Sequence, residues 1–247
     1  KITLPDGIDI NFNDFEQIYL VACGTAFYAC HVAKYWFEDI ARIPVEIDIA
    51  SEFRYREPPI KKNTLAIFVS QSGETADTLA ALRYCTGKAK KIVSLTNVFE
   101  SSISRESDCS LPILAGIEIG VASTKAFTCQ LSVLFALAIK ASSDLEKISN
   151  EEQMNIYSEA IKIPSLINKI LDKKDSFSAL ATKLSEARDV LFLGRGLLYP
   201  LALEGALKLK EISYIHAEAY ASGELKHGPI ALIDKSVPVI ILTPKDK

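Results

Sequence analysis

The sequence predicts an α/β fold in which parallel sheets are covered by helices on both faces. Short apolar runs alternate along the chain with segments of helical periodicity. Most of these runs are apolar throughout, as is typical of parallel strands that are buried on both faces. The order of elements starts again after residue 189, which predicts two such units of the flavodoxin-like three-layer kind, the second one truncated.

The first part of the chain gives the clearest alternation. Most strand predictions rest on an apolar run, and the one at 45–49 rests on Val and Ile that alternate with acids. The helix predictions rest on helical periodicity. We expect strands at 18–23, 45–49, 65–70, 91–95 and 109–113, and helices at 27–40, 76–85, 101–107 and 124–140.

The second part begins with a polar stretch, 142–189, whose helical periodicity is interrupted near Pro164. A strand is then expected at 190–193, a helix from about Pro200 to 215, and a strand at 237–242. These elements predict a first domain at 1–143, a helical connector at 144–189 and the N-terminal part of a second domain at 190–247.

A faint duplication supports this division. Cys23 and Gly194 each end a predicted strand, and similar Ala-Ser-containing segments begin at Ala50 and Ala221, at the same offset from them. Two matches alone are weak grounds for a repeat, but the order of elements agrees. A complete second unit would extend beyond residue 247.

Composition excludes several classes of function. The net charge is −3 and no basic stripe appears, which argues against a nucleic-acid partner. The longest apolar stretch, 131–139, is too short to cross a bilayer, and no signal peptide opens the chain. Five scattered cysteines predict reduced thiols in a cytoplasmic protein, and three histidines apart from them predict no metal site. No cofactor is expected.

The stretch Ser70-Gln71-Ser72-Gly73-Glu74-Thr75 lies between a predicted strand and a predicted helix. Hydroxyls at 70, 72 and 75 meet the unpaired N–H groups of a helix start, and glycine allows close backbone approach. A phosphate monoester needs such donors together with the helix dipole. A capping box with Ser72 as N-cap and Thr75 three residues on explains the same residues. The sequence leaves both interpretations open.

A second group of polar residues lies on the predicted helix after Pro200. Glu204, Lys208 and Glu211 have the spacing of one helical face. An exposed Glu–Lys ladder is the simpler explanation, but a lysine and a glutamate could also transfer protons in a sugar isomerisation. His227 follows in a loop between Gly and Pro residues, and histidine titrates near neutrality.

A third segment, 116–127, joins a predicted strand to a predicted helix. Ser123 and Thr124 are its candidate N-caps, and a capped helix start explains the segment without any ligand.

Four segments together resemble the isomerase part of the glutamine–fructose-6-phosphate aminotransferase (glucosamine-6-phosphate synthase) family, which contains two sugar-isomerase (SIS) domains. Lys-x-Lys-Glu-Ile-Ser-Tyr-Ile-His-Ala-Glu, followed by Gly-Glu-Leu-Lys-His-Gly-Pro, is the most specific. The resemblance covers nearly the whole chain, and its segments are 23–25, 70–78, 118–127 and 203–234.

The resemblance implies a role for each matching residue. The groups that would hold the sugar phosphate are Ser70, Gln71, Ser72 and Thr75, and Thr25, the Val121 backbone and Ser123 would line the sugar pocket. Glu211 would move a proton between C1 and C2, Lys208 would assist it, and His227 would open the fructose ring from the other subunit of a dimer. The substrate would be fructose 6-phosphate and the product glucosamine 6-phosphate.

The sequence departs from the family in three ways. Ala26 stands where the family commonly has Ser, so one sugar-contacting hydroxyl is absent. The family's N-terminal glutaminase domain and its C-terminal Schiff-base lysine are not in these residues, which predicts a fragment with incomplete activity. A sugar-phosphate sensor without catalysis, or an SIS isomerase or deglycase for another phosphosugar, are the alternatives.

Overall fold

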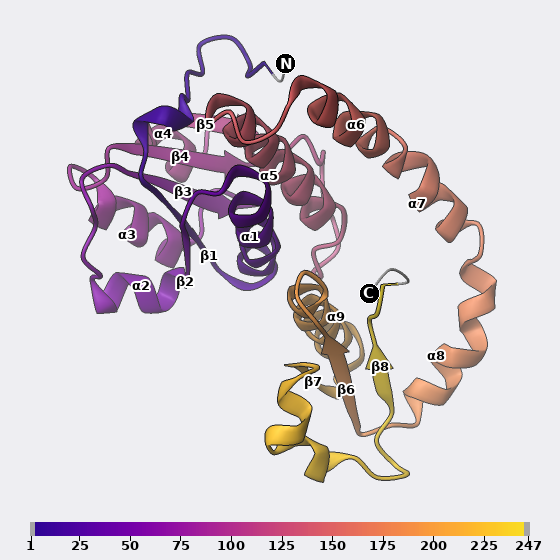
Figure 1. Cartoon of the computed structure of the whole chain (residues 1–247). Coiled ribbons are helices and arrows are strands. Elements are labelled where there is room, and N and C mark those ends of the chain that lie inside the picture. The colour runs from indigo at the N-terminus through magenta and orange to yellow at the C-terminus, as the bar shows by residue number, and fades with distance from the viewer. Residues whose placement is uncertain (1–2, 245–247) are drawn as a thin grey trace. The chain divides into compact units, whose positions relative to one another are not determined.

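The structure is a computed structural model that describes residues 3–244 and divides into two units, one ending at Ser149 and the other beginning at Asn150 (Figure 1). The boundary lies inside the stretch expected to be a connector, and residues 150–189 group with the second unit. The three-part division at 143 and 189 remains a prediction.

The first unit contains a five-stranded parallel sheet in the order β2-β1-β3-β4-β5. This is the flavodoxin-like order, in which the connections from β1 and β3 leave toward opposite edges. Each strand lies within one residue of its expected bounds. The strands are β1 Gln17–Ala22, β2 Val45–Ile49, β3 Thr64–Ser70, β4 Lys91–Thr96 and β5 Cys109–Pro112.

Helices cover both faces of this sheet, which confirms the predicted three layers. Helices α1 (Gly24–Trp36) and α5 (Lys125–Asp144) share one core cluster with alternate strand residues. The residues between them on the strands face a second cluster, built with α2 (Ala50–Arg56), α3 (Ala76–Cys85) and α4 (Ser102–Glu106).

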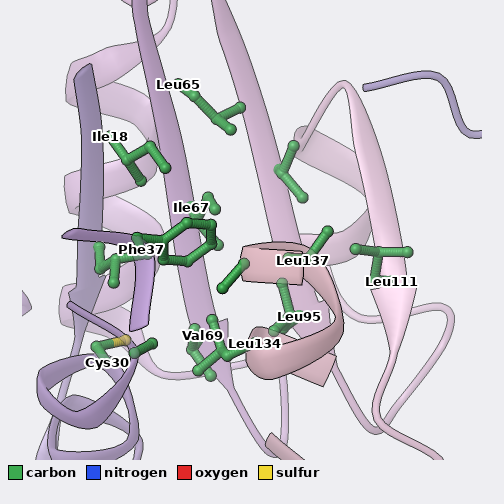
Figure 2. Close-up of a cluster of buried hydrophobic side chains, with 14 of the residues drawn as sticks. Ile18, Cys30, Phe37, Leu65, Ile67, Val69, Leu95, Leu111, Leu134 and Leu137 are labelled. Atoms are coloured by element: carbon green, nitrogen blue, oxygen red, sulfur yellow. The ribbon is translucent and has the colours of Figure 1, made fainter. Parts of the chain in front are cut away.

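The first cluster is the larger of the two (Figure 2). Ile67 of β3 lies in it beside Phe37, which begins the π-helical turn Phe37–Ala41 that ends α1, and Leu134 of α5 packs against the same strands. All three side chains are fully buried. Each contributes about 2–3 kcal/mol by leaving water, so this face fixes the positions of α1 and α5.

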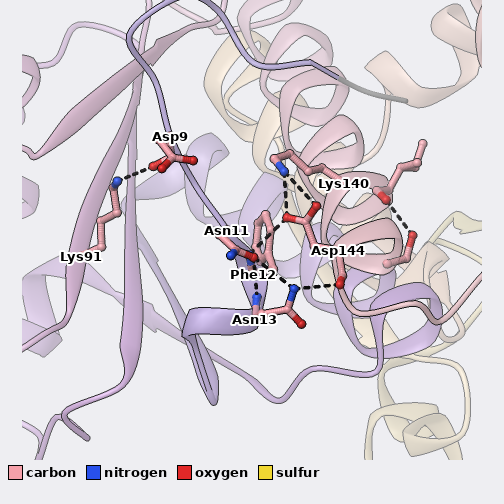
Figure 3. Close-up of polar contacts among 9 residues, drawn as sticks. Asp9, Asn11, Phe12, Asn13, Lys91, Lys140 and Asp144 are labelled. Atoms are coloured by element: carbon pink, nitrogen blue, oxygen red, sulfur yellow. Dashed lines mark hydrogen bonds and ion pairs between the residues drawn. The ribbon is translucent and has the colours of Figure 1, made fainter.

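The end of α5 is tied to the start of the chain (Figure 3). Asp144 accepts a hydrogen bond from the Phe12 N–H at 3.2 Å through Oδ2, and pairs with Lys140 at 2.7 Å. Its carbonyl oxygen accepts a hydrogen bond from Asn13 Nδ2 at 2.9 Å. These bonds explain why α5 continues four residues past its expected end at 140.

By length and composition alone, α5 would also suit a membrane span. Its apolar residues Leu134, Leu137 and Ala138 are instead buried against the sheet. The apolar character of α5 is therefore that of a core helix in this fold.

The second unit begins with helices that are largely exposed: α6 (Asn150–Ala160), α7 (Ile163–Leu171) and α8 (Ser178–Ser185). Pro164 lies in the first turn of α7, where its missing N–H breaks no helical hydrogen bond. The predicted interruption near Pro164 is thus confirmed as a helix start.

A three-stranded parallel sheet follows in the order β7-β6-β8. Its strands are β6 Asp189–Gly194, β7 His216–Ala221 and β8 Val239–Ile241. Helix α9 Leu198–Ser213 connects β6 to β7, and the 3-10 turns η4 Glu224–His227 and η5 Pro229–Leu232 lie between β7 and β8.

The two sheets repeat one pattern. The order β7-β6-β8 corresponds to β2-β1-β3, and a helix links the first two strands in each. Ile18 pairs with Val45, and Val190 with Ala217, at the same separation along the chain. The register therefore agrees with the duplication suggested by the sequence.

Two elements were not expected from the sequence. Helix α2 is short, and β7 is a strand whose side chains alternate between small and polar residues. The apolar positions of β7 are alanines, so it lacks the Val and Ile residues that marked even the alternating strand β2.

Candidate functional site

A cavity of about 200 Å³ lies in the first unit, the room of about six water molecules in the liquid. Its lining comes mainly from the residues after β1 and β3, where connections depart in opposite directions and open α/β sheets bind ligands. The lining residues are Cys23, Thr25, Ala26, Val69, Ser70, Gln71, Ser72, Thr75, Ser123 and Gln130.

The loop after β3 supplies the polar side of this cavity. Ser70, the last residue of β3, is buried, and its Oγ lies 2.9 Å from Thr75 Oγ1. The Gly73 N–H donates to Ser70 Oγ at 3.0 Å, and the Glu74 N–H donates to Ser72 Oγ at 3.2 Å. We call residues 70–75 the cradle. Its hydroxyls are held by local hydrogen bonds around the start of α3.

The capping-box interpretation of the cradle is wrong. The N-cap of α3 is Thr75, three residues after Ser72, and its side chain makes no capping bond. Ser72 instead closes a short turn through the Glu74 N–H. The first N–H groups of α3 have no partner inside the helix, and the Thr75 side chain does not cap them.

A neighbouring helix braces the cradle from behind. Glu74 Oε1 accepts a hydrogen bond from the Ser102 N–H at 2.7 Å, and the Gly73 carbonyl oxygen accepts one from the Ile103 N–H at 3.0 Å. The bond from Ser102 lowers the pKa of Glu74 below its ordinary value, so the carboxylate is charged at neutral pH. Glu74 does not line the cavity, and this keeps its charge away from a bound anion.

Ser123 reaches the cavity from the loop before α5. Its hydroxyl donates to Glu118 Oε2 at 3.1 Å, and Glu118 Oε1 accepts the Thr124 N–H at 2.8 Å. Partial burial raises the pKa of Glu118, but these hydrogen bonds outweigh it and lower the pKa on balance. Thr124 is the N-cap by position, yet its side chain makes no capping bond. The Glu118 carboxylate, and not the expected Ser123 or Thr124 hydroxyl, accepts hydrogen bonds at the start of α5.

The expected binding residues lie together, with one exception. Thr25 and Ser123 line the same cavity as the cradle. Val121 is not among the lining residues, and its side chain is fully exposed. Its role in binding, like that of the others, remains a prediction.

Four lining residues were not singled out from the sequence as binding groups: Cys23, Ala26, Val69 and Gln130. Gln130 could have been identified from the sequence pattern of α5. It is a polar residue on a helical stripe of α5 whose neighbouring members Ala126, Leu134 and Leu137 are apolar and buried.

The charged residues of α9 belong to the second unit. Lys208 Nζ lies 2.5 Å from Glu211 Oε2 and 3.5 Å from Glu204 Oε1, so the three side chains share one face as predicted. Their side-chain exposures are 7% for Glu204, 19% for Lys208 and 33% for Glu211. A wholly exposed ladder is therefore wrong at the Glu204 end.

His227 is the last residue of η4 and is exposed. It belongs to the second unit, as Glu211 and Lys208 do, whereas the cradle belongs to the first. The sequence thus distributes its candidate groups over both units.

The chemistry of the cavity favours an anion with several acceptor oxygens. Its lining contains hydroxyls, an amide-bearing Gln71 and a helix N-terminus, but no Asp, Glu, Lys or Arg among the described lining residues. Neutral donors aimed at one point, with a helix dipole behind them, bind a phosphate group without a cation.

Comparison with known proteins places the chain. The SIS domain family matches residues 12–140 and 183–247, which contain the two sheets. The chain belongs to the SIS domain family. The predicted SIS fold is therefore confirmed.

Relatives of this SIS chain match it along nearly its whole length. Glutamine–fructose-6-phosphate aminotransferase (isomerizing) from Brucella abortus is 57% identical over 242 residues, or 98% of this chain. The enzyme of the same name from Bradyrhizobium diazoefficiens is 56% identical over 247 residues. The resemblance seen in the sequence is thus confirmed.

A solved structure agrees with these sequences. The C-terminal domain of glucosamine-fructose-6-phosphate aminotransferase from Francisella tularensis is 44% identical, with a TM-score of 0.93. The match covers 96% of this SIS chain and 67% of that one. The chain spans only 40% of the Brucella protein, so it corresponds to part of such an enzyme.

Proposed function

We propose that this chain is the isomerase part of a glutamine–fructose-6-phosphate aminotransferase. It would convert fructose 6-phosphate and ammonia to glucosamine 6-phosphate, the first step of hexosamine synthesis. The observation that carries the proposal is the neutral cradle at the β1–β3 switch point, in a chain 57% identical to enzymes of that name.

The cradle would anchor the substrate by its phosphate. Ser70, Ser72 and Thr75 offer hydroxyl donors, and Gln71 offers an amide donor. A dianion held at one end of the sugar leaves C1 and C2 at the other. Binding energy gained at the phosphate then orients the carbons that react.

The reaction itself would need a proton to move between two carbons. Ammonia would condense with the C2 ketone, releasing water and leaving an imine. Glu211 would take a proton from C1 and deliver one to C2. In the same isomerisation O1 loses its proton and becomes the aldehyde oxygen, and the imine nitrogen gains a proton and becomes the amine. Lys208, at 2.5 Å from Glu211, would assist this transfer. His227 would open the fructose ring.

The wider assembly follows from the same proposal. The ammonia would come from glutamine through a glutaminase domain of the complete protein, and His227 would act across a homodimer. The enzyme would work in the cytoplasm. No cofactor or metal takes part in the steps assigned here to Glu211, Lys208 and His227.

A different phosphosugar enzyme is the second candidate. Glucosamine-6-phosphate deaminase from Thermotoga maritima is 26% identical to this chain, with a TM-score of 0.75. The paired Lys208 and Glu211 favour either enzyme over a sensor that binds without catalysis, because a sensor needs only the cradle.

A thermal-shift titration tests the phosphate site. Fructose 6-phosphate and glucosamine 6-phosphate should raise the melting temperature, since a ligand at a hundredfold excess over its Kd adds about 2.7 kcal/mol. Ser72→Ala should reduce the shift. Ser158→Ala removes an exposed serine outside the cavity and should leave the shift unchanged. If neither sugar phosphate stabilises the wild type, the proposed function fails.

A further inference from the structure

The cavity contains a polar side chain for which the proposed roles give no use. Gln130 of α5 lines the cavity, is 1% exposed, and its Oε1 has no hydrogen-bond partner among the described residues. We propose that Gln130 is a substrate-binding residue whose amide oxygen accepts a hydrogen bond from a hydroxyl of the bound sugar. This inference rests on the proposed function of the cavity as a phosphosugar site.

The packing of α5 argues that Gln130 serves binding rather than stability. Its neighbours on the buried stripe are apolar, with Ala126 before it and Leu134 after it. A leucine would suit that stripe, whereas a buried acceptor without a partner is unfavourable. Residues that oppose local stability in this way are expected at functional sites.

The chemistry of the amide oxygen selects its partner. An ionised phosphate offers only acceptors, and a carbonyl oxygen can only accept, so the two cannot bond. A sugar hydroxyl can donate. Gln130 should therefore contact the carbohydrate part of the substrate, while the cradle holds the phosphate.

The part of the cavity wall formed by Ala26 leaves room for a sugar hydroxyl near Gln130. Ala26 of α1 presents only a methyl group to the cavity, and helices α1 and α5 share one core cluster. Gln130 then supplies a polar contact beside an apolar part of the wall. Discrimination between sugars would depend on this contact, because an unsatisfied buried polar group penalises a ligand that lacks the matching hydroxyl.

Two ligands separate this inference from the proposed function. Fructose 6-phosphate carries both phosphate and hydroxyls, whereas methyl phosphate is a phosphate monoester without sugar hydroxyls. Binding of each to the 247-residue chain can be followed by NMR titration for the wild type and for Gln130→Leu. We expect Gln130→Leu to weaken fructose 6-phosphate about tenfold and to change methyl phosphate less than about twofold.

Gln153→Leu is the matched control. Gln153 is also a buried glutamine with an unpartnered amide atom, but it lies on α6 and does not line the cavity. It should bind both ligands like the wild type. The melting temperature of Gln130→Leu without ligand should equal or exceed that of the wild type, so that a loss of affinity is not a loss of folding.

The outcomes distinguish the two proposals. If the wild type binds both ligands and Gln130→Leu binds each with the wild-type affinity, Gln130 has no part in binding and the inference is overturned while the function stands. Equal weakening of both ligands would assign Gln130 to the phosphate end and also overturn it. If the wild type binds neither ligand, the proposed function fails and the inference falls with it.

A set of deoxy sugars would identify the hydroxyl. Fructose 6-phosphate analogues that lack one hydroxyl each can be titrated against the wild type and Gln130→Leu. For the partner hydroxyl, its removal should weaken binding to the wild type but have no further effect in the variant. Additive losses for every hydroxyl would contradict the proposed contact.

Discussion

The two units of the chain present polar groups in opposite ways. In the first, the cradle after β3 gathers hydroxyls and backbone N–H groups in a loop, held by bonds among Ser70, Gly73 and Thr75. In the second, α9 aligns Glu204, Lys208 and Glu211 along one helical face. One arrangement is neutral and convergent, and the other is charged and linear.

The difference follows from what each arrangement can do. Binding a dianion requires several donors aimed at one point, which a strand-to-helix turn with a glycine provides. Moving a proton requires a group that gains and loses charge, and a helix places such groups at fixed spacing. The side chains of α9 become more exposed from Glu204 to Glu211, so the expected base lies at the accessible end.

The largest expected effect concerns the charged arrangement. In the full-length enzyme, Glu211→Gln should lower kcat about a hundredfold to ten-thousandfold, because the variant cannot take the proton from C1. The free energy of unfolding should change by less than about 1 kcal/mol, since a partly exposed ion pair such as that with Lys208 contributes little. Steady-state kinetics and urea denaturation give both numbers.

Glu186→Gln, at an exposed glutamate of the same unit, is the control and should retain full activity. Full activity of Glu211→Gln would show that the base lies elsewhere.

The second prediction concerns the shape of the cradle. Gly73 has a φ of +67°, and a Cβ there would lie 1.9 Å from Ser101 Oγ and 2.4 Å from Ser101 Cβ, on a residue that is itself buried. Gly73→Ala should therefore lower the free energy of unfolding by about 2–4 kcal/mol and abolish fructose 6-phosphate binding. Chemical denaturation and the thermal-shift titration measure the two effects.

Gly223→Ala provides the comparison from the second unit. A Cβ on Gly223 meets no atom within 4 Å, so this variant should have wild-type stability. If Gly73→Ala were as stable as Gly223→Ala, the close approach of the cradle to Ser101 would not matter for the fold.

The smallest expected effect concerns the charged residue that supports the neutral site. Glu118→Gln should lower the free energy of unfolding at neutral pH by about 1 kcal/mol, because the loop before α5 loses its carboxylate at a helix N-terminus. The folded-state pKa of Glu118 is depressed from 4.5. Its contribution is thus full above pH 4.5 and is lost as the pH falls through the folded-state pKa.

The measurement is a series of urea denaturation curves from neutral to acidic pH. Wild type and Glu118→Gln should converge in acid, and Glu100→Gln, at an exposed glutamate, should follow the wild type throughout. A constant difference at all pH values would mean that the Glu118 charge has no part in holding Ser123.

Much of the fold could be predicted because buried parallel strands are continuous apolar runs. The strands β1 and β3 were found within one residue, and α3 at its observed bounds, Ala76–Cys85. The strand β7 was missed because alanines occupy its apolar positions, whereas Val and Ile in the alternating strand β2 gave a β-type signal. Local pattern therefore identifies a strand where β-branched residues mark it and fails where small residues take their place.

The caps show a second limit. Sequence reasoning assigned them to hydroxyl side chains near the helix starts, Ser72 and either Ser123 or Thr124. The structure assigns the α5 start to Glu118, six residues before Thr124 in the chain. A loop that folds back can bring a carboxylate to a helix start. The conformation of such a loop depends on tertiary contacts and cannot be read from the residues next to the helix.

The sequence by itself determined the cradle, because its hydroxyls and Gly73 lie within six consecutive residues and bond to one another. Only the tertiary structure decided that Thr25, Ser123 and Gln130 meet the cradle. The physical reason is packing: α1 and α5 lie far apart in the chain, and their orientation is set by the core that they share on one face of the sheet. Composition and spacing therefore found the proposed phosphate-binding residues, and packing brought the residues proposed to contact the sugar to the same cavity.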